Sequence, residues 1–301
     1  MNRGGTNSQD VVAVESFRSA RAFLDALHPS DKRWRANPAS WIFRGHADSN
    51  WRLLPSAFRR ESLAAFDDRA PDPATLPEDA RAAGERLILR QFGEGLDLVG
   101  LPLPGMSRAA LDELKPETPH APQWPRECLE LAALAQHHGV PTRLLDFTRS
   151  GHVAAYFAGQ RPLGSTEGSI AVWALDTAFL EHGTRCATIW FELARVSRAV
   201  NPNLHAQSGV FVVWTGSDEL LSLDAIVAGV CSGALPLCSG SVRKSRPIMR
   251  KLVLPARHGP ELLGLLVDER ISGATLFPGV EGVVRQLKEA RIHRRFTAVH
   301  S

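Results

Sequence analysis

The sequence predicts an α+β protein: a single domain with a split or mixed β-sheet flanked by helices. Short apolar runs typical of strands are dispersed through all 301 residues instead of being gathered in one half. Residues 249–292 then alternate strand-like and helix-like segments, an order that favours a mixed architecture. The composition, with 44% hydrophobic and 22% charged residues, is that of an ordinary globular domain.

The first elements follow a polar stretch. We expect residues 1–10 to form a disordered tail and residues 11–301 to form the domain. Residues 11–27 predict a short strand and then an amphipathic helix, whose apolar face contains Phe17, Ala20, Phe23 and Leu24. Residues 40–45 (SWIFRG) predict a strand that brings an arginine to the edge of the sheet, and residues 50–60 are expected to lead into a helix.

Two proline-rich stretches interrupt the pattern. Residues 70–79 contain three prolines and residues 101–125 contain six. Because proline breaks both helices and strands, we predict that both stretches are surface insertions. Between them, residues 80–96 have helical spacing.

The second half contains more regular elements. Residues 127–138 predict a helix that Gly139 and Pro141 end, and Ser150 is the predicted N-cap of a helix that reaches Gly159. Strands are predicted over residues 169–175, 210–214, 249–255 and 274–278, with the apolar segment 188–193 between the first two. Further helices are predicted over residues 259–271 and 280–292.

Charge, apolar runs and cysteine spacing exclude several classes of protein. The net charge of +3, from 35 basic and 32 acidic residues, is too balanced for nonspecific binding of polyanions. No apolar stretch reaches the roughly 18 residues of a membrane span and no signal peptide is visible, so we expect a cytoplasmic protein with no membrane partner. The four cysteines form no CxxC pair, which favours buried, reduced thiols.

Arg44 and Gly45 are the first candidate site residues. They end the predicted strand over residues 40–45. The guanidinium of Arg44 suits bidentate binding of a phosphate, and Gly45 lets a ligand approach the backbone. The alternative is a structural arginine that pairs with an acidic neighbour such as Asp48.

Residues 135–152 form the second candidate, because histidines, arginines, threonines and an aspartate gather there at a helix end. His137 and His138 lie in the last helical turn, where the negative end of the helix dipole stabilises an imidazolium. The alternative is that one histidine caps the last carbonyls and the other packs against Pro141.

Arg143 and Asp146 in the same stretch have two interpretations. A turn at Pro141 lets them meet as a partly buried ion pair that holds the loop. The pair does not exclude that both residues line a site. A metal site is disfavoured, because neighbouring His137 and His138 point in different directions and no HExxH pattern accompanies them. A serine hydrolase is disfavoured because no GxSxG turn is present.

Four motifs together identify the chain as a member of the FRG-domain family, named for its Phe-Arg-Gly tripeptide. They are WIFRGHADSNWRLLPSAFR at 41–59, LAQHHGVPTRLLDFTRSGHVAAYFA at 134–158, AQSGVFVV at 206–213 and GATLFPGVEGVVRQL at 273–287. The resemblance implies a bacterial or phage-related cytosolic protein, from a family often found beside defence and mobile elements.

The order of these motifs is also similar to the layout of ADP-ribosyltransferases, which implies an ADP-ribosyltransferase-like core. In that superfamily a strand arginine binds NAD, a Ser/Thr-rich strand supports the site, and a glutamate before a later strand drives transfer. Arg44, residues 146–148 and residues 207–209 occupy those places. Gly209 stands where the glutamate is expected, with Gln207 two residues earlier.

This resemblance implies an NAD-handling transferase that needs no metal and acts on an unidentified acceptor, protein, nucleic acid, small molecule or water, in anti-phage defence or as a toxin. The catalytic candidates are Asp146, His137, His138 and Gln207, and the candidates that bind NAD are Arg44, Gly45, Thr142, Arg143 and Thr148. The alternative is a non-catalytic module that senses a nucleotide, a nucleic acid or a phage component.

Overall fold

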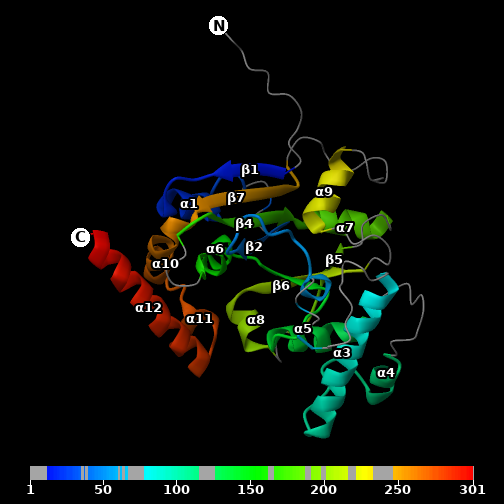
Figure 1. Ribbon diagram of the computed structural model, residues 1–301. Helices are drawn as coiled ribbons and strands as arrows, with labels where there is room; N and C mark the ends of the chain where they lie inside the picture. The colour runs from blue at the N-terminus through cyan, green and yellow to red at the C-terminus, as the bar shows by residue number, and fades with distance from the viewer. Residues whose placement is uncertain are drawn as a thin grey trace. The chain divides into compact units, whose positions relative to one another are not determined.

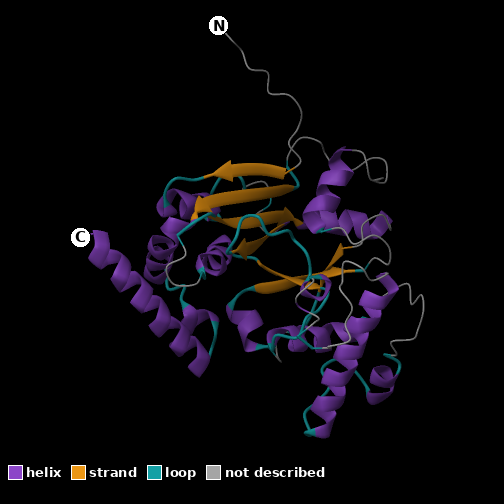
Figure 2. Ribbon diagram, viewed as in Figure 1, coloured by secondary structure: helices purple, strands orange, loops and turns teal. Residues whose placement is uncertain are grey.

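The computed structural model has an α+β fold with one mixed β-sheet flanked by helices, as predicted (Figures 1 and 2). It describes residues 12–34, 40–59, 78–114, 126–161, 166–186, 191–197, 201–215, 222–232 and 247–300, and the single residues 37, 62, 65 and 66. The predicted tail and the stretch 70–77 lie outside the described residues.

The chain divides into two compact units. The first unit consists of Met1–Trp51, Thr148–His182 and Asp224–Ser301, and the second of Arg52–Phe147 and Gly183–Leu223. The sheet contains seven strands in the order β1-β7-β4-β2-β3-β6-β5. β1 is parallel to β7, whereas the pairs β7/β4, β4/β2, β2/β3 and β6/β5 are antiparallel.

The first unit contains most of the sheet. Its strands are β1 (Val12–Ser16), β2 (Trp41–His46), β4 (Ser169–Asp176) and β7 (Met249–Pro255). Its helices are α1 (Ala20–Leu27), α6 (Gly151–Gly159), α10 (Gly259–Asp268), α11 (Gly273–Leu276) and α12 (Val280–His300). The chain passes between the units within α7 (Thr177–Cys186) and at the start of α9 (Leu223–Ser232).

The core of the first unit lies on one face of these strands. Phe43 of β2, Val172 of β4 and Leu252 of β7 are buried there against α1, α6 and α10. Figure 1 shows α6 beside β2. The predicted apolar face of α1 is confirmed, and the Oγ atom of Ser19 caps the helix by accepting a hydrogen bond from the Ala22 amide.

The second unit contains β3 (Leu144–Phe147, with Thr148 in the first unit), β5 (Phe191–Ala194) and β6 (Gly209–Trp214). Its helices are η2 (Ser56–Phe58), α3 (Glu78–Leu98), α4 (Arg108–Asp112), α5 (Cys128–His137) and α8 (Pro202–Ala206). α3, α4 and α5 share one apolar cluster with β6.

One sequence prediction about local structure was wrong. Residues 274–278 are not a strand, because a capping box between Ser272 and Thr275 starts α11. The described part of the proline-rich stretch 101–125 ends at residue 114. It contains the short helix α4, which Ser107 caps, and it buries Leu111 and Leu114. The segment after residue 50 leads into the short helix η2.

Among the described residues, we find no helix that combines the length and the apolar character needed to span a membrane.

A charged cluster links β1, β7 and the segment after α1. Glu15 accepts hydrogen bonds from Arg33 at 2.7 Å and from Arg250 at 3.0 Å. The hydrogen bond from Arg33 is the main reason that the pKa of Glu15 lies below its ordinary value. The ionised Glu15 carboxylate therefore contributes its full stabilisation above the ordinary pKa of glutamate. This stabilisation is lost as the pH falls through the lowered pKa of Glu15 in the folded protein.

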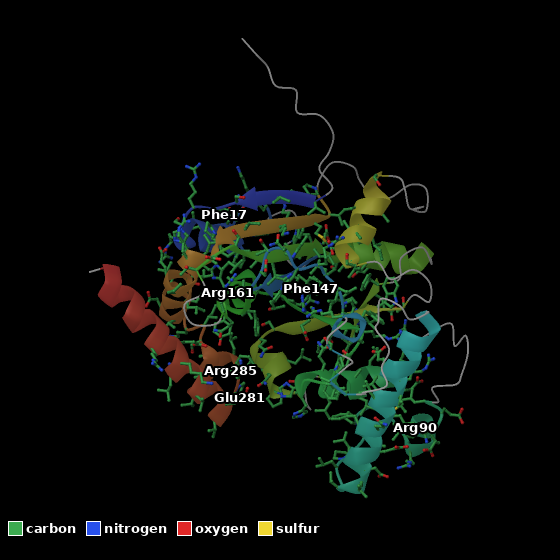
Figure 3. All side chains as sticks on the ribbon, viewed as in Figure 1. Phe17, Arg90, Phe147, Arg161, Glu281 and Arg285 are labelled. Atoms are coloured by element: carbon green, nitrogen blue, oxygen red, sulfur yellow. The ribbon has the colours of Figure 1, made fainter. Side chains whose placement is uncertain are left out.

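We expect Glu15→Gln to lower the free energy of unfolding by about 1 kcal/mol at pH 7 and to make it less dependent on pH below about pH 5. Urea unfolding at a series of pH values measures this. Glu281→Gln is the control, because Glu281 pairs with Arg285 on the exposed surface of α12 (Figure 3). Equal acid sensitivity of the Glu15 variant and the wild type would contradict this account.

Candidate functional site

The Phe43-Arg44-Gly45 tripeptide lies within β2, with its residues facing alternate sides of the strand. Phe43 enters the core, where its ring centroid lies 5.1 Å from that of Trp34. Gly45 lies under α6: a Cβ atom there would be 2.0 Å from the Ala154 carbonyl oxygen and 2.6 Å from the Ala158 amide nitrogen. The close approach that Gly45 permits is therefore the approach of α6, which corrects the expectation of a ligand at this backbone.

Arg44 has a fixed orientation. Its Nε–H donates to Nε2 of His46 at 3.1 Å, and the other ring nitrogen of His46 lies 3.3 Å from the carbonyl oxygen of Trp51. If Nε2 accepts, Nδ1 carries the proton and donates to Trp51, so one neutral tautomer satisfies both contacts. His46 is buried and was not singled out in the sequence analysis, although its place two residues after Arg44 puts it on the same face.

The loop after β2 is held from two sides. Arg161, just beyond the end of α6, donates from Nη1 to the Ala47 carbonyl at 2.6 Å (Figure 3). Asp48, the predicted alternative partner of Arg44, accepts a hydrogen bond from the Asn50 amide at 2.8 Å. The turn that follows Arg44 is thus held by Arg161 and by the hydrogen bond between Asn50 and Asp48 within the turn.

Arg143 has a carboxylate partner that the sequence analysis did not find. Its Nε donates to Oε2 of Glu85 at 2.7 Å and its amide donates to Oε1 at 2.7 Å, while Nη1 lies 3.5 Å from the Trp214 carbonyl oxygen. The side chains of Arg143 and Glu85 are 5% and 0% exposed. Glu85 is thus a buried partner of Arg143 in addition to the one expected from the sequence, and this pair opposes the phosphate-binding role expected of Arg143.

Glu85 comes from α3, in the stretch of the chain that carries no recognised motif. Its sequence neighbours Leu87, Ile88 and Leu89 indicate a buried helix face, but nothing local identifies the arginine that it meets. A buried carboxylate needs such a partner, and only the fold brings the two together.

Thr142 is fully buried in the second unit. Its hydroxyl donates a short hydrogen bond to Gln136, and its amide donates to the Ser56 hydroxyl at 3.0 Å. These contacts tie the end of α5 and η2 to β3. They give Thr142 a structural role.

Asp146 and Thr148 differ in exposure along β3. Asp146 is exposed, whereas Thr148 is buried and pairs with Phe43 of β2. The Thr148 hydroxyl accepts a hydrogen bond from the Ser150 amide at 3.0 Å, and Ser150 caps α6 as predicted. Thr148 therefore shapes the turn into α6, and Asp146 remains a carboxylate open to solvent.

His137 and His138 end α5 as predicted, and both are exposed. Their ring centroids are 5.0 Å apart. Nε2 of His137 lies 3.5 Å from Nδ2 of Asn203 on α8, and the backbone amide of His138 takes part in capping the helix. Both imidazoles are accessible from solvent.

Residues 207–209 join α8 to β6. Gln207 is the C-cap of α8, and Ser208 adopts a positive φ of 50°, the left-handed conformation that often ends a helix. At Gly209 a Cβ atom would lie 2.4 Å from Cδ1 of Leu204 and 3.2 Å from its carbonyl oxygen. The place of the expected glutamate is thus filled by Leu204.

The candidate residues fall into two groups. Arg44, Gly45 and Thr148 belong to the first unit, and the second unit contains Thr142, Arg143, Asp146, His137, His138 and Gln207. Within the described residues, no three His, Cys, Asp or Glu side chains gather in a way that could hold a metal ion. Burial raises the pKa of the Cys128 thiol to about 12, as expected of an inert thiol.

Comparison with known families identifies one domain. The model of the FRG domain matches residues 39–167, which include β2, β3 and α6. This match confirms the predicted FRG domain over these residues, whereas the motifs at 206–213 and 273–287 lie outside the matched range. Neither the curated proteins nor the solved structures contain a match to the chain.

We expect Glu85→Gln to lower the free energy of unfolding by about 3 kcal/mol, because it leaves the buried guanidinium of Arg143 without a counter-charge. Chemical denaturation measures this change. The matched control is Glu94→Gln on the same helix, whose partner Arg90 is partly exposed, and it should cost under about 1 kcal/mol. Equal effects of the two substitutions would contradict the role of the buried pair.

Proposed function

Since residues 39–167 form an FRG domain, we propose that the protein is an enzyme that binds NAD and breaks its nicotinamide–ribose bond, in the manner of an ADP-ribosyltransferase. The proposed products are nicotinamide and an ADP-ribosylated acceptor, or ADP-ribose where water is the acceptor. We infer that this activity acts in a bacterial cell as part of phage defence or as a toxin. The proposal rests on analogy of layout and on the residues discussed below.

The observation that carries the proposal is the orientation of Arg44. A guanidinium whose Nε–H is bound to His46 has its direction set before a ligand arrives. Arginine is the side chain best suited to planar, bidentate recognition of phosphate. The pyrophosphate of NAD is the ligand that we assign to it.

Asp146 supplies the carboxylate of the proposed mechanism. Breaking the bond between nicotinamide and ribose leaves positive charge on the ribose, and the bonding electrons leave with nicotinamide. An exposed carboxylate stabilises that charge and accepts the proton of an attacking acceptor. His137 or His138 is the alternative base, and Gln207 orients the ligand.

Gly209 favours a second function, a non-catalytic nucleotide-binding module. The position expected to hold the catalytic glutamate has no side chain, and Leu204 fills the space beside it. In this second function Arg44 still binds a nucleotide phosphate, but nothing is cleaved. The two functions therefore differ in turnover and not in binding.

Release of nicotinamide from NAD by the purified chain tests the proposal, with cell extract, DNA or RNA added in turn to supply acceptors. We expect Arg44→Ala to lower kcat/KM about 10- to 100-fold, through loss of charged hydrogen bonds, and Asp146→Asn to lower kcat about 100-fold or more. Arg108→Ala is the control, because Arg108 is an exposed arginine on α4 that pairs with Asp97.

Release that depends on neither Arg44 nor Asp146 would overturn the assignment of these residues. If NAD binds in an Arg44-dependent manner but no nicotinamide appears with any fraction, the binding module replaces the enzyme. If NAD neither binds nor reacts, the NAD-cleaving function is wrong, and the same titration with other nucleotides then tests the binding module.

A further inference from the structure

Arg44 begins a row of three side chains across adjacent strands of the first unit. The strand register pairs Arg44 of β2 with Trp173 of β4, and Trp173 with Lys251 of β7. Residues paired directly across strands project from the same face of the sheet. Because Phe43 and Gly45 face the core and α6, this row lies on the opposite face.

The strand residues on this face include more basic than acidic side chains. The register places Ile42, Arg44 and His46 of β2 on it, together with alternate residues of β4, β7 and β1 (Ser169, Ala171, Trp173, Leu175, Met249, Lys251, Val253, Pro255, Val12, Val14 and Ser16). Two of these residues are permanent cations and none is acidic. The acidic residues of the same strands, Glu15 and Asp176, project from the other face.

Trp173 lies between the two cations. It is 4% exposed, and its indole N–H has no hydrogen-bond partner in the part of the chain that the structure describes. The Nζ atom of Lys251 lies 4.6 Å from the centroid of its ring. A buried donor without an acceptor is uncommon in folded proteins and indicates a missing acceptor.

The row opens to solvent on one side. Val14 of β1, which pairs with Lys251, is 62% exposed, and Lys251 itself is partly exposed. Lys251 reaches over the ring of Trp173 on a flexible stem of four carbons.

We propose that Arg44, Trp173 and Lys251 form a diphosphate-binding row. Strands lie about 4.8 Å apart, so the backbones of Arg44 and Lys251 are about 10 Å apart, with Trp173 between them in the register. Arg44 binds one phosphate, Lys251 binds the other, and the indole N–H donates to an oxygen between them. The inference deepens the proposed function and rests on it only in naming the diphosphate as that of NAD.

Calorimetric titration with inorganic pyrophosphate, ADP-ribose and AMP tests the row. We expect Lys251→Met, which keeps the apolar stem, to weaken the binding of pyrophosphate and of ADP-ribose at least tenfold. The binding of AMP should weaken much less. Trp173→Phe, which keeps most of the ring surface but removes the N–H donor, should weaken the binding of pyrophosphate several-fold. Lys288→Met, on exposed α12, is the control and should bind as the wild type does.

Circular dichroism and thermal unfolding show whether each variant is folded, and Lys251→Met decides the test if Trp173→Phe does not fold. Unchanged binding of pyrophosphate by Lys251→Met, or no binding by the wild type, would overturn the row. Lys251-dependent binding of pyrophosphate without release of nicotinamide would support the row while the proposed activity fails. Release of nicotinamide that depends on Arg44 but not on Lys251 or Trp173 would support the proposed activity and overturn the row.

Discussion

The backbone of α6 packs directly against Gly45 of β2 in the first unit. Any side chain at position 45 would collide with the Ala154 carbonyl and the Ala158 amide, so helix and strand meet without an intervening layer of side chains. The small residues of α6 serve the same purpose elsewhere, since a Cβ atom at Gly151 would lie 2.7 Å from the Leu27 carbonyl oxygen. This contact determines which face of β2 packs against α6, and the alternation of the strand then puts Arg44 and His46 on the other face. The positions of the anion-binding candidates thus follow from a glycine that itself touches no ligand.

The second unit is organised around a different constraint, the buried pair of Arg143 and Glu85. Two charges that leave water together must satisfy one another, and the two oxygens of Glu85 bind both the side chain and the amide of Arg143. The pair connects α3 to the residue before β3. Arg143 therefore has a structural role, whereas Arg44 is the arginine that we propose to bind phosphate, although both occur in conspicuous motifs of the chain.

Much of the fold was predictable because its signals are local. The amphipathic face of α1, the N-cap at Ser150 and the end of α5 at Gly139 depend on residues within one or two turns, and all were predicted. The error at residues 274–278 arose where a weak local signal competed with a stronger one. The β-branched and apolar residues there concealed the capping box that starts α11, and the prolines around residues 102–125 likewise concealed the short helix that starts after Ser107.

The candidate site was less predictable, because its contacts join distant parts of the chain. The FRG tripeptide drew attention to Arg44, but the place of His46 and Trp51 beside it depends on the turn after β2. Trp173 and Lys251 join Arg44 only through the register of three strands, which no short window of sequence specifies. No local sequence signal identifies the partner of Glu85 either, because Glu85 and Arg143 are far apart in the chain. Residues whose role depends on pairing across the sheet, or on burial beside a distant partner, require the structure.

The central claim is that Arg44 binds the phosphates of a dinucleotide. The affinity of the intact chain and of Arg44→Gln for ADP-ribose, measured by titration calorimetry, tests this. We predict saturable binding to the wild type and at least a tenfold weaker affinity for Arg44→Gln, with both proteins unfolding at similar temperatures, because Gln keeps hydrogen-bonding capacity but not the charge. Equal affinity of the two proteins, or no binding to the wild type, would contradict the account.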